Sequence, residues 1–188
     1  MPSANALQWI METITLGGGC FWCLEAVYDE MEGVDSVESG YMGGHVANPD
    51  YRSVCTGSTG HIEVVQVKFD PAVTSTREIL EVFFAIHDPT SLDSQGNDAG
   101  TQYRSAIFYH TREQCETAQA LIDELEREKI WSRPIVTEVR PAMQFYKAEE
   151  YHQDYFRNNP KQPYCAIVVS PKVRKFREKF AARMRKGA

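Results

Sequence analysis

The chain has 188 residues, of which 43% are hydrophobic and 24% charged, and this composition fits one domain with a sizeable core. The longest apolar runs span only five residues, as over 82–86, far short of the roughly 20 that a membrane helix requires, so we expect no membrane protein. The net charge of −6 disfavours nucleic-acid binding over most of the surface, and the lack of Lys or Arg before Arg52 argues against a basic targeting leader and indicates a cytoplasmic protein.

Strands and helices are predicted to alternate along the chain. The predicted strands cover 13–16, 34–41, 61–69, 104–109, 135–139 and 165–169. The predicted helices run over 21–31, 75–86, 111–125 and 148–156, and a last one begins at Pro171. Capping boxes at Ser75 and Thr111 support two of the helix starts. This alternation predicts an α/β or α+β domain over 13–188, preceded by an extension over 1–12.

Two kinds of segment depart from this regular pattern. Long loops rich in glycine and small polar residues are predicted over 43–60 and 88–103, and loops of such length often carry functional residues. The basic segment 172–186 holds eight of the 20 Lys and Arg residues. We expect its charges to face water while an apolar helical stripe packs on the domain; the stripe consists of Val173, Phe176, Phe180 and Met184.

The chain has an odd number of cysteines although its core needs no disulfides: Cys20, Cys23, Cys55, Cys115 and Cys165. Cys20 follows the glycines 17–19 and begins a predicted helix, where backbone N–H groups and the helix dipole stabilise a thiolate. We therefore predict that Cys20 has a lowered pKa and acts as a nucleophile. The alternative is a cysteine packed beneath the glycine turn.

Cys20 and Cys23 also form a C-x-x-C motif, which is typical of dithiol-disulfide oxidoreductases and of zinc sites. A zinc site needs a second closely spaced pair of ligands, but the other three cysteines stand alone and no two of the five histidines have ligand spacing. We predict no bound metal and no cofactor. Thioredoxin-like chemistry at the C-x-x-C motif stays open as an alternative function.

Glu63 interrupts an apolar pattern. In the predicted strand 61–69, alternation places it on the same face as Val65, Val67 and Phe69. A carboxyl among apolar side chains loses hydration, which raises its pKa and keeps it protonated near neutral pH. Glu63 is therefore a candidate general acid. The alternative is a frayed strand end whose carboxylate lies in water.

Three separated segments contain these candidates in one order: Gly19-Cys20-Phe21-Trp22, GSTGHIE over 57–63, and GNDAGTQYRS over 96–105, with Tyr51 between the first two. Together they resemble the signature sequences of peptide methionine sulfoxide reductase, A type. The resemblance extends from about Thr13 to the region of Cys165. It implies a two-layer α/β sandwich on a mixed sheet, with a ferredoxin-like core and long functional loops.

The resemblance implies an activity, the thiol-dependent reduction of methionine S-sulfoxide, free or in proteins. Transferred residue by residue, it makes Cys20 the nucleophile and Glu63 the acid. It assigns substrate binding to Phe21, Trp22, Tyr51, Asp98 and Tyr103. A sulfoxide carries a methyl group that aromatic rings can contact and an oxygen that requires hydrogen-bond donors, and these residue types supply both.

The product on the enzyme is a Cys20 sulfenic acid, which condenses with a second thiol to a disulfide that an external dithiol, implied to be thioredoxin, reduces. Cys165 is the favoured second thiol, because its Tyr164-Cys165 context resembles the family's recycling cysteine and follows a flexible segment. A position in a strand would limit its movement, however. Cys23, one helical turn from Cys20, is the alternative.

The remaining candidates are interpreted as structural. Cys115 lies on the apolar face of a predicted helix, Cys55 is expected to be packed in its loop, and His152 is expected to be a packing residue. We expect a monomer that binds neither nucleic acid nor membranes. A thioredoxin-like oxidoreductase is the alternative function, and a metal-binding module is a more distant one.

Overall fold

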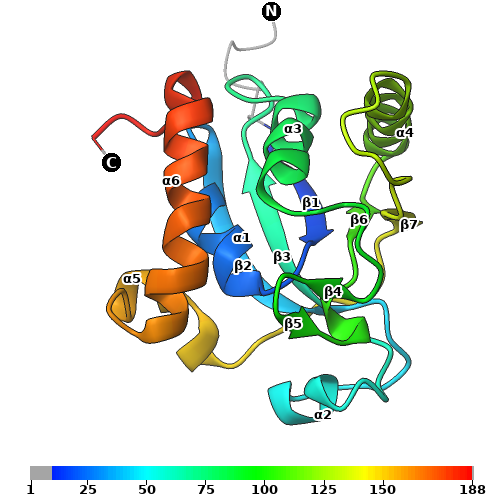
Figure 1. The fold of residues 1–188 in the computed structure, drawn as a ribbon, viewed down its shortest axis with the longest axis vertical. Coiled ribbons are helices and arrows are strands. Elements are labelled where there is room, and N and C mark those ends of the chain that lie inside the picture. The colour runs from blue at the N-terminus through cyan, green and yellow to red at the C-terminus, as the bar shows by residue number, and fades with distance from the viewer. Residues whose placement is uncertain (1–9, 188) are drawn as a thin grey trace, which may run out of the picture.

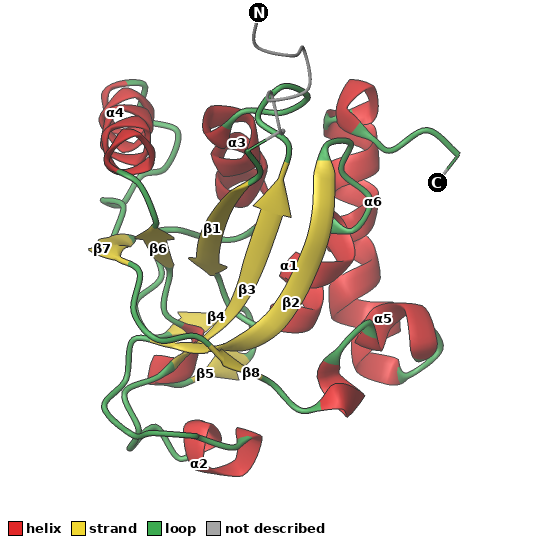
Figure 2. Ribbon diagram, turned by 180° about the vertical axis from the view of Figure 1, so that it is seen from behind, coloured by secondary structure: helices red, strands yellow, loops and turns green. Residues whose placement is uncertain are grey.

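A six-stranded sheet organises the structure, a computed structural model that describes residues 10–187. The strand order is β7-β6-β1-β3-β2-β8 (Figures 1 and 2). The strands are β1 (Glu12–Gly17), β2 (Val34–Met42), β3 (Ile62–Phe69), β6 (Ala106–Tyr109), β7 (Glu138–Pro141) and β8 (Tyr146–Lys147). Neighbouring strands are antiparallel except β6 and β7, which are parallel, so the sheet is mixed.

The four inner strands and two helices form a ferredoxin-like unit. Along the chain the order is β1, α1 (Phe21–Tyr28), β2, β3, α3 (Thr76–Ile86) and β6. In space β1 and β3 are central and β6 and β2 flank them, so each helix crosses the strand that lies between the two it connects. This arrangement confirms the predicted α/β sandwich on a mixed sheet.

Helices cover one face of the sheet, where the main core lies. They are α1, α3, α4 (Arg112–Arg127) and α6 (Ser170–Lys179), and in Figure 2 the sheet stands in front of α1 and α6. Val65, Val67 and Phe69 of β3 belong to this core, whereas Ile62 and Val64 join a smaller cluster with Phe108. Because side chains alternate along a strand, Glu63 shares the helix-covered face, as predicted.

Local capping determines where two of the helices begin. The Ser75 hydroxyl accepts a hydrogen bond from the Glu78 N–H at the start of α3, and the Thr111 hydroxyl accepts one from the Gln114 N–H at the start of α4. Each bond satisfies a backbone donor that has no partner within its helix. Both predicted helix starts are confirmed.

The two long loops contain short elements. α2 (Tyr51–Cys55) lies within 43–60, and the hairpin of β4 (Ser94–Gln95) and β5 (Asp98–Ala99) lies within 88–103, followed by a 3₁₀ turn (Thr101–Tyr103). Figure 1 shows α2, β4 and β5 at the same end of the molecule. The loops thus bring residues from distant parts of the sequence to one end of the sheet.

The strand predicted over 165–169 is wrong. These residues form a π-helical turn (Cys165–Val169) that runs directly into α6 at Ser170. Cys165 and Val169, four residues apart, are buried on one face of this turn, whereas Ile167 is 73% exposed. The β-branched run Ile167-Val168-Val169 favours a strand by local propensity, but helical spacing lets the segment bury one face against the domain.

The helix predicted over 148–156 is also wrong. A 3₁₀ turn (Glu150–His152) and α5 (Tyr155–Asn158) replace it, and Asp154 between them has a φ of 53°, which a right-handed helix does not allow. The strand predicted over 135–139 lies further along, as β7. The predicted extension over 1–12 falls mostly outside the described residues.

The C-terminal helix packs as its apolar spacing predicts. Val173 and Phe176 of α6 are buried, Phe180 and Met184 pack against the core, and Met184 forms a bridge to Met31. No helix within residues 10–187 combines the length and apolar character needed to cross a membrane.

Candidate active site

Cys20 lies at the turn between β1 and α1 and is 8% exposed. Gly19 in this turn has a φ of +91°, and a Cβ there would lie 2.9 Å from the side chain of Gln95. Only glycine combines this backbone conformation with so close an approach. The glycine run therefore holds the start of α1 tightly against the β4–β5 hairpin.

Glu63 reaches the same place from β3. Its side chain is 1% exposed, and its Oε1 accepts a hydrogen bond of 3.3 Å from the Phe21 N–H, the first of α1. Burial raises the pKa of Glu63 from its ordinary value of 4.5 to about 8, and the charges of Asp98 and Cys23 add to the increase. Glu63 is therefore protonated near neutral pH, as predicted.

Cys20 and Glu63 line one cavity of about 270 Å³. The other predicted binding residues line it too, together with two that the sequence analysis did not select; the full lining is Cys20, Phe21, Trp22, Tyr51, Glu63, Asp98, Tyr103, Gln162 and Tyr164. Burial raises the pKa of the hydroxyls of Tyr51 and Tyr103, so both are hydrogen-bond donors over the physiological range.

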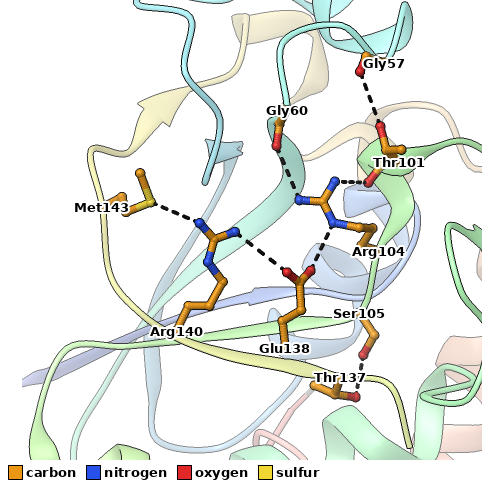
Figure 3. A network of polar contacts seen from close by, with 9 residues as sticks. All are labelled: Gly57, Gly60, Thr101, Arg104, Ser105, Thr137, Glu138, Arg140 and Met143. Carbon is orange, nitrogen blue, oxygen red and sulfur yellow. Dashed lines mark hydrogen bonds and ion pairs between the residues drawn. The ribbon is translucent and has the colours of Figure 1, made fainter.

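A polar network joins the two loops that supply this cavity (Figure 3). Arg104 donates from Nε to Glu138 at 3.0 Å, from Nη1 to the Thr101 carbonyl at 2.9 Å and from Nη2 to the Gly60 carbonyl at 3.4 Å. The Thr101 hydroxyl in turn lies 3.5 Å from the Gly57 carbonyl. These contacts fasten the segment before β3 to the one before β6, which positions Glu63 relative to Tyr103.

Aromatic residues support Trp22 on its outer side. The Trp22 ring stacks on Tyr155 with centroids 3.8 Å apart and 6° between the planes, and it meets the edge of Tyr164 at 5.6 Å. Its Nε1–H donates to His152 Nδ1 at 3.1 Å. His152 is buried, which lowers its pKa, and it also contacts the rings of Phe21 and Tyr51. It thus packs as predicted, but as a support for the cavity wall.

Tyr164 is the main residue of the site that the sequence analysis did not select. Its hydroxyl donates to Asp98 Oδ2 at 2.5 Å, which links the β4–β5 hairpin to the turn before α6. The only available signal was its position next to Cys165. The prediction that Cys165 reacts with Cys20 implied that this neighbour also lies near the site, but it gave Tyr164 no role there.

The predicted low pKa of Cys20 is wrong for the substrate-free protein. Burial raises the pKa of Cys20 well above its ordinary value of 9.0, and the hydrogen bond with Cys23 and the charge of Glu63 raise it further. Only the Trp22 N–H lowers it, since the Phe21 N–H donates to Glu63. The prediction treated the helix N-terminus as available to Cys20 and omitted desolvation.

The second cysteine of the C-x-x-C motif behaves in the opposite way. The hydrogen bond from Cys20 and then the charge of Lys172 lower the pKa of Cys23, against the effect of burial. Cys23 sits one turn along α1, and its N–H donates to the Cys20 carbonyl at 3.1 Å. The two thiols are therefore hydrogen-bonded to each other and titrate as a pair.

The other cysteines lie outside the cavity. Cys165 is fully buried in the π-helical turn, in the same core as Cys23, and its pKa is raised by burial and then by the charge of Cys23. Cys55 is exposed at the end of α2, so its predicted packing is wrong, and Cys115 is half-buried on α4. Among residues 10–187, no group of three or more His, Cys, Asp or Glu side chains is placed to hold a metal ion.

Comparisons with known proteins agree with this geometry. Residues 12–184 match the family model described as peptide methionine sulfoxide reductase. Peptide methionine sulfoxide reductase MsrA of Polynucleobacter asymbioticus is 58% identical over 170 residues, 90% of each chain. The structure of Saccharomyces cerevisiae Mxr1 in reduced form has a TM-score of 0.75 and 37% identity, covering 82% of this chain and 89% of that one. For Mxr1 in complex with Trx2 the TM-score is 0.54, with 29% identity over 77% and 84% of the two chains. The chain therefore belongs to the peptide methionine sulfoxide reductase A family.

Proposed function

We propose that this chain reduces the S epimer of methionine sulfoxide, free or in proteins, with Cys20 as nucleophile and Glu63 as general acid. As a member of its family it is an oxidoreductase. The observation that carries the proposal is that a buried, protonated carboxyl and a cysteine thiol line the same small cavity, whose walls are aromatic rings and tyrosine hydroxyls. A thiol can attack the sulfoxide sulfur there while the carboxyl protonates the departing oxygen.

The protons balance within the site. Both Glu63 and Cys20 are protonated before substrate enters, because burial raises both pKa values. Glu63 gives its proton to the sulfoxide oxygen and becomes a carboxylate, which then accepts the proton of the Cys20 thiol. The hydroxyl then moves from the substrate sulfur to the Cys20 sulfur, and the bond that the attack formed between the two sulfurs breaks with the S–O bond. Cys20 is thereby oxidised to a sulfenic acid, and methionine leaves with its sulfur reduced. The raised pKa of Cys20 is thus compatible with catalysis, because Glu63 serves as both acid and base.

The cavity wall suits a methyl sulfoxide. Phe21 and Trp22 offer ring faces to the methyl group, and the hydroxyls of Tyr51 and Tyr103 are available to the oxygen. Asp98 accepts a hydrogen bond from the Tyr164 hydroxyl and so fixes this aromatic ring at the edge of the site. Removing these donors would leave the sulfoxide oxygen, which is strongly hydrated in water, without partners.

We propose that Cys23 closes the first disulfide. Its sulfur is hydrogen-bonded with that of Cys20, so it is the thiol in direct contact with the sulfenic acid when that forms. It attacks the sulfenic sulfur, the S–O bond breaks, and the hydroxide leaves as water after taking up a proton. Cys165, which is buried in the same core as Cys23, then exchanges to a Cys23–Cys165 disulfide and releases Cys20 as a thiol. Both cysteines considered from the sequence therefore have a role, in succession.

A dithiol protein of the thioredoxin type would complete the cycle by reducing the final disulfide. The solved complex of Mxr1 with Trx2 supports this choice of reductant. We also propose that the protein is a monomer, that it is cytoplasmic and that it does not bind nucleic acid.

The test is incubation of reduced protein with racemic methyl p-tolyl sulfoxide and dithiothreitol, followed by chiral analysis of the remaining sulfoxide. We expect the S enantiomer to disappear and the R enantiomer to persist. Equal consumption of both enantiomers, or of neither, would contradict the proposal. Reduction of insulin disulfides without any sulfoxide turnover would instead support the dithiol-disulfide oxidoreductase.

A further inference from the structure

A second cavity adjoins the catalytic one. It has a volume of about 660 Å³, and Asp98 and Tyr164 line both. Its other walls come from the end of α3, the β4–β5 hairpin, and the π-helical turn with the first turns of α6, elements that surround one region in Figure 1. We call it the flank groove, defined by Asp88, Trp131, Ile167, Val168, Lys172 and Lys175.

The flank groove is longer than a single side chain requires. A second hollow of about 270 Å³ adjoins it along α6, and the two share Ala85, His87, Trp131 and Lys175. The catalytic cavity, the flank groove and the second hollow therefore adjoin one another in this order. When a methionine sulfoxide side chain of a polypeptide occupies the catalytic cavity, the residues next to it in sequence lie beside that cavity. The flank groove is at this place.

The charges in the groove are unbalanced. Asp98 accepts from Tyr164, and Asp88 accepts from Thr90 and pairs with Arg133, so both acids already have partners. Within residues 10–187, no carboxylate oxygen lies within 4.0 Å of the ammonium group of Lys172 or Lys175. These two lysines, which lack an ion-pair partner, make the groove positively charged on a chain whose net charge is −6.

The apolar part of the groove is exposed. Ile167 is 73% exposed and lies with Val168 and the half-buried Trp131 around the same hollow. Apolar side chains beside unpaired lysines fit a peptide segment that carries an apolar and an acidic residue.

We propose that the flank groove binds the residues next to methionine sulfoxide in a protein substrate and favours sequences with Asp or Glu there. This inference rests on the proposed function, because it places the oxidised side chain in the catalytic cavity. The specificity arises from Lys172 and Lys175, and the apolar wall adds contact area. Free methionine sulfoxide, which has no flanking residues, gains nothing from the groove.

The experiment is a single turnover of fully reduced protein, without any reductant, on two sets of blocked peptides. Each contains one methionine S-sulfoxide and either Glu or Lys at one of the three positions on either side. We expect the Glu peptides to react about fivefold faster at low concentration and low salt, the size of one or two partly exposed ion pairs. The preference should decline as salt screens the lysines.

Lys175→Glu should reverse the preference, and Lys175→Gln should remove most of it. Neither change should alter turnover of free methionine S-sulfoxide, and Lys68→Gln, an exposed lysine on β3, is the control. Equal rates for Glu and Lys peptides, or a preference that survives both changes, would overturn the inference. The inference would also be overturned if these variants lost only thioredoxin-supported cycling and kept the peptide preference. The groove would then be the binding site of the reductant. If free substrate is not reduced either, the proposed function fails as well.

Discussion

Replacing Glu63 by Gln tests the burial argument and the catalytic argument together. Gln has nearly the same shape, and its carbonyl oxygen can still accept from the Phe21 N–H, but it has no proton to transfer and never ionises. Wild type and variant should therefore differ only where the proton on Glu63 matters.

The stability difference follows from the raised pKa of Glu63, which is 4.5 ordinarily and about 8 in the fold. The protonated carboxyl contributes stability that is fully present below pH 4.5 and is lost as the pH rises through about 8. Between pH 5 and pH 8 this loss amounts to roughly 3 kcal/mol of unfolding free energy, at about 1.4 kcal/mol for each unit. In Glu63→Gln the loss is absent, and other titrating groups cancel in the comparison.

The kinetic difference has the same origin. The single-turnover rate of wild type should fall as the pH rises through about 8, where Glu63 loses its proton. In Glu63→Gln this decline should disappear, and the rate at neutral pH should be lower by about 10²–10⁴-fold, the usual contribution of a positioned acid.

Two assays check these expectations: urea unfolding of both proteins from pH 5 to 8, and stopped-flow single turnovers over the same range. If the unfolding free energies of wild type and variant changed with pH in the same way, Glu63 would not be a buried, uncharged carboxyl. A variant that reduces sulfoxide at nearly the wild-type rate at neutral pH would remove Glu63 from proton transfer.

Three further predictions concern residues around Glu63. Cys20→Ser should abolish sulfoxide reduction with dithiothreitol as well as with thioredoxin, because an alcohol is a far weaker nucleophile, and activity above a few per cent of wild type would contradict the assignment. Cys23→Ser should still form one methionine per enzyme in a single turnover but should accumulate the Cys20 sulfenic acid, detectable by mass after dimedone labelling, whereas Cys165→Ser should trap the Cys20–Cys23 disulfide. The reverse pattern would make Cys165 the first partner. Arg104→Met, which removes the links between the two loops in Figure 3, should lower the unfolding free energy by about 1–3 kcal/mol in urea and raise the KM for free sulfoxide. Arg112→Met, whose ion pair with Glu116 is exposed, is the control and should change neither.

Local sequence was sufficient for much of this protein. Alternation along 61–69 predicts the face of Glu63, capping residues predict the starts of α3 and α4, and apolar spacing predicts the packing of α6. Each of these features depends on residues two to four positions apart, whose geometry the backbone itself imposes. The signature segments and Tyr51 likewise supplied seven of the residues that line the catalytic cavity.

Tertiary contacts decided the rest. The run at 165–169 has strand propensity, but burial of Cys165 and Val169 on one side makes it helical. The proton on Cys20 likewise depends on Cys23, on Glu63 from β3 and on the desolvation of the whole cavity, and only the fold brings these together. Propensity and helix dipoles act over one or two turns, whereas desolvation and charge depend on every element packed around a group. The sequence alone therefore identified most of the residues that line the catalytic cavity, and the tertiary structure decided their protonation and the surface beside them.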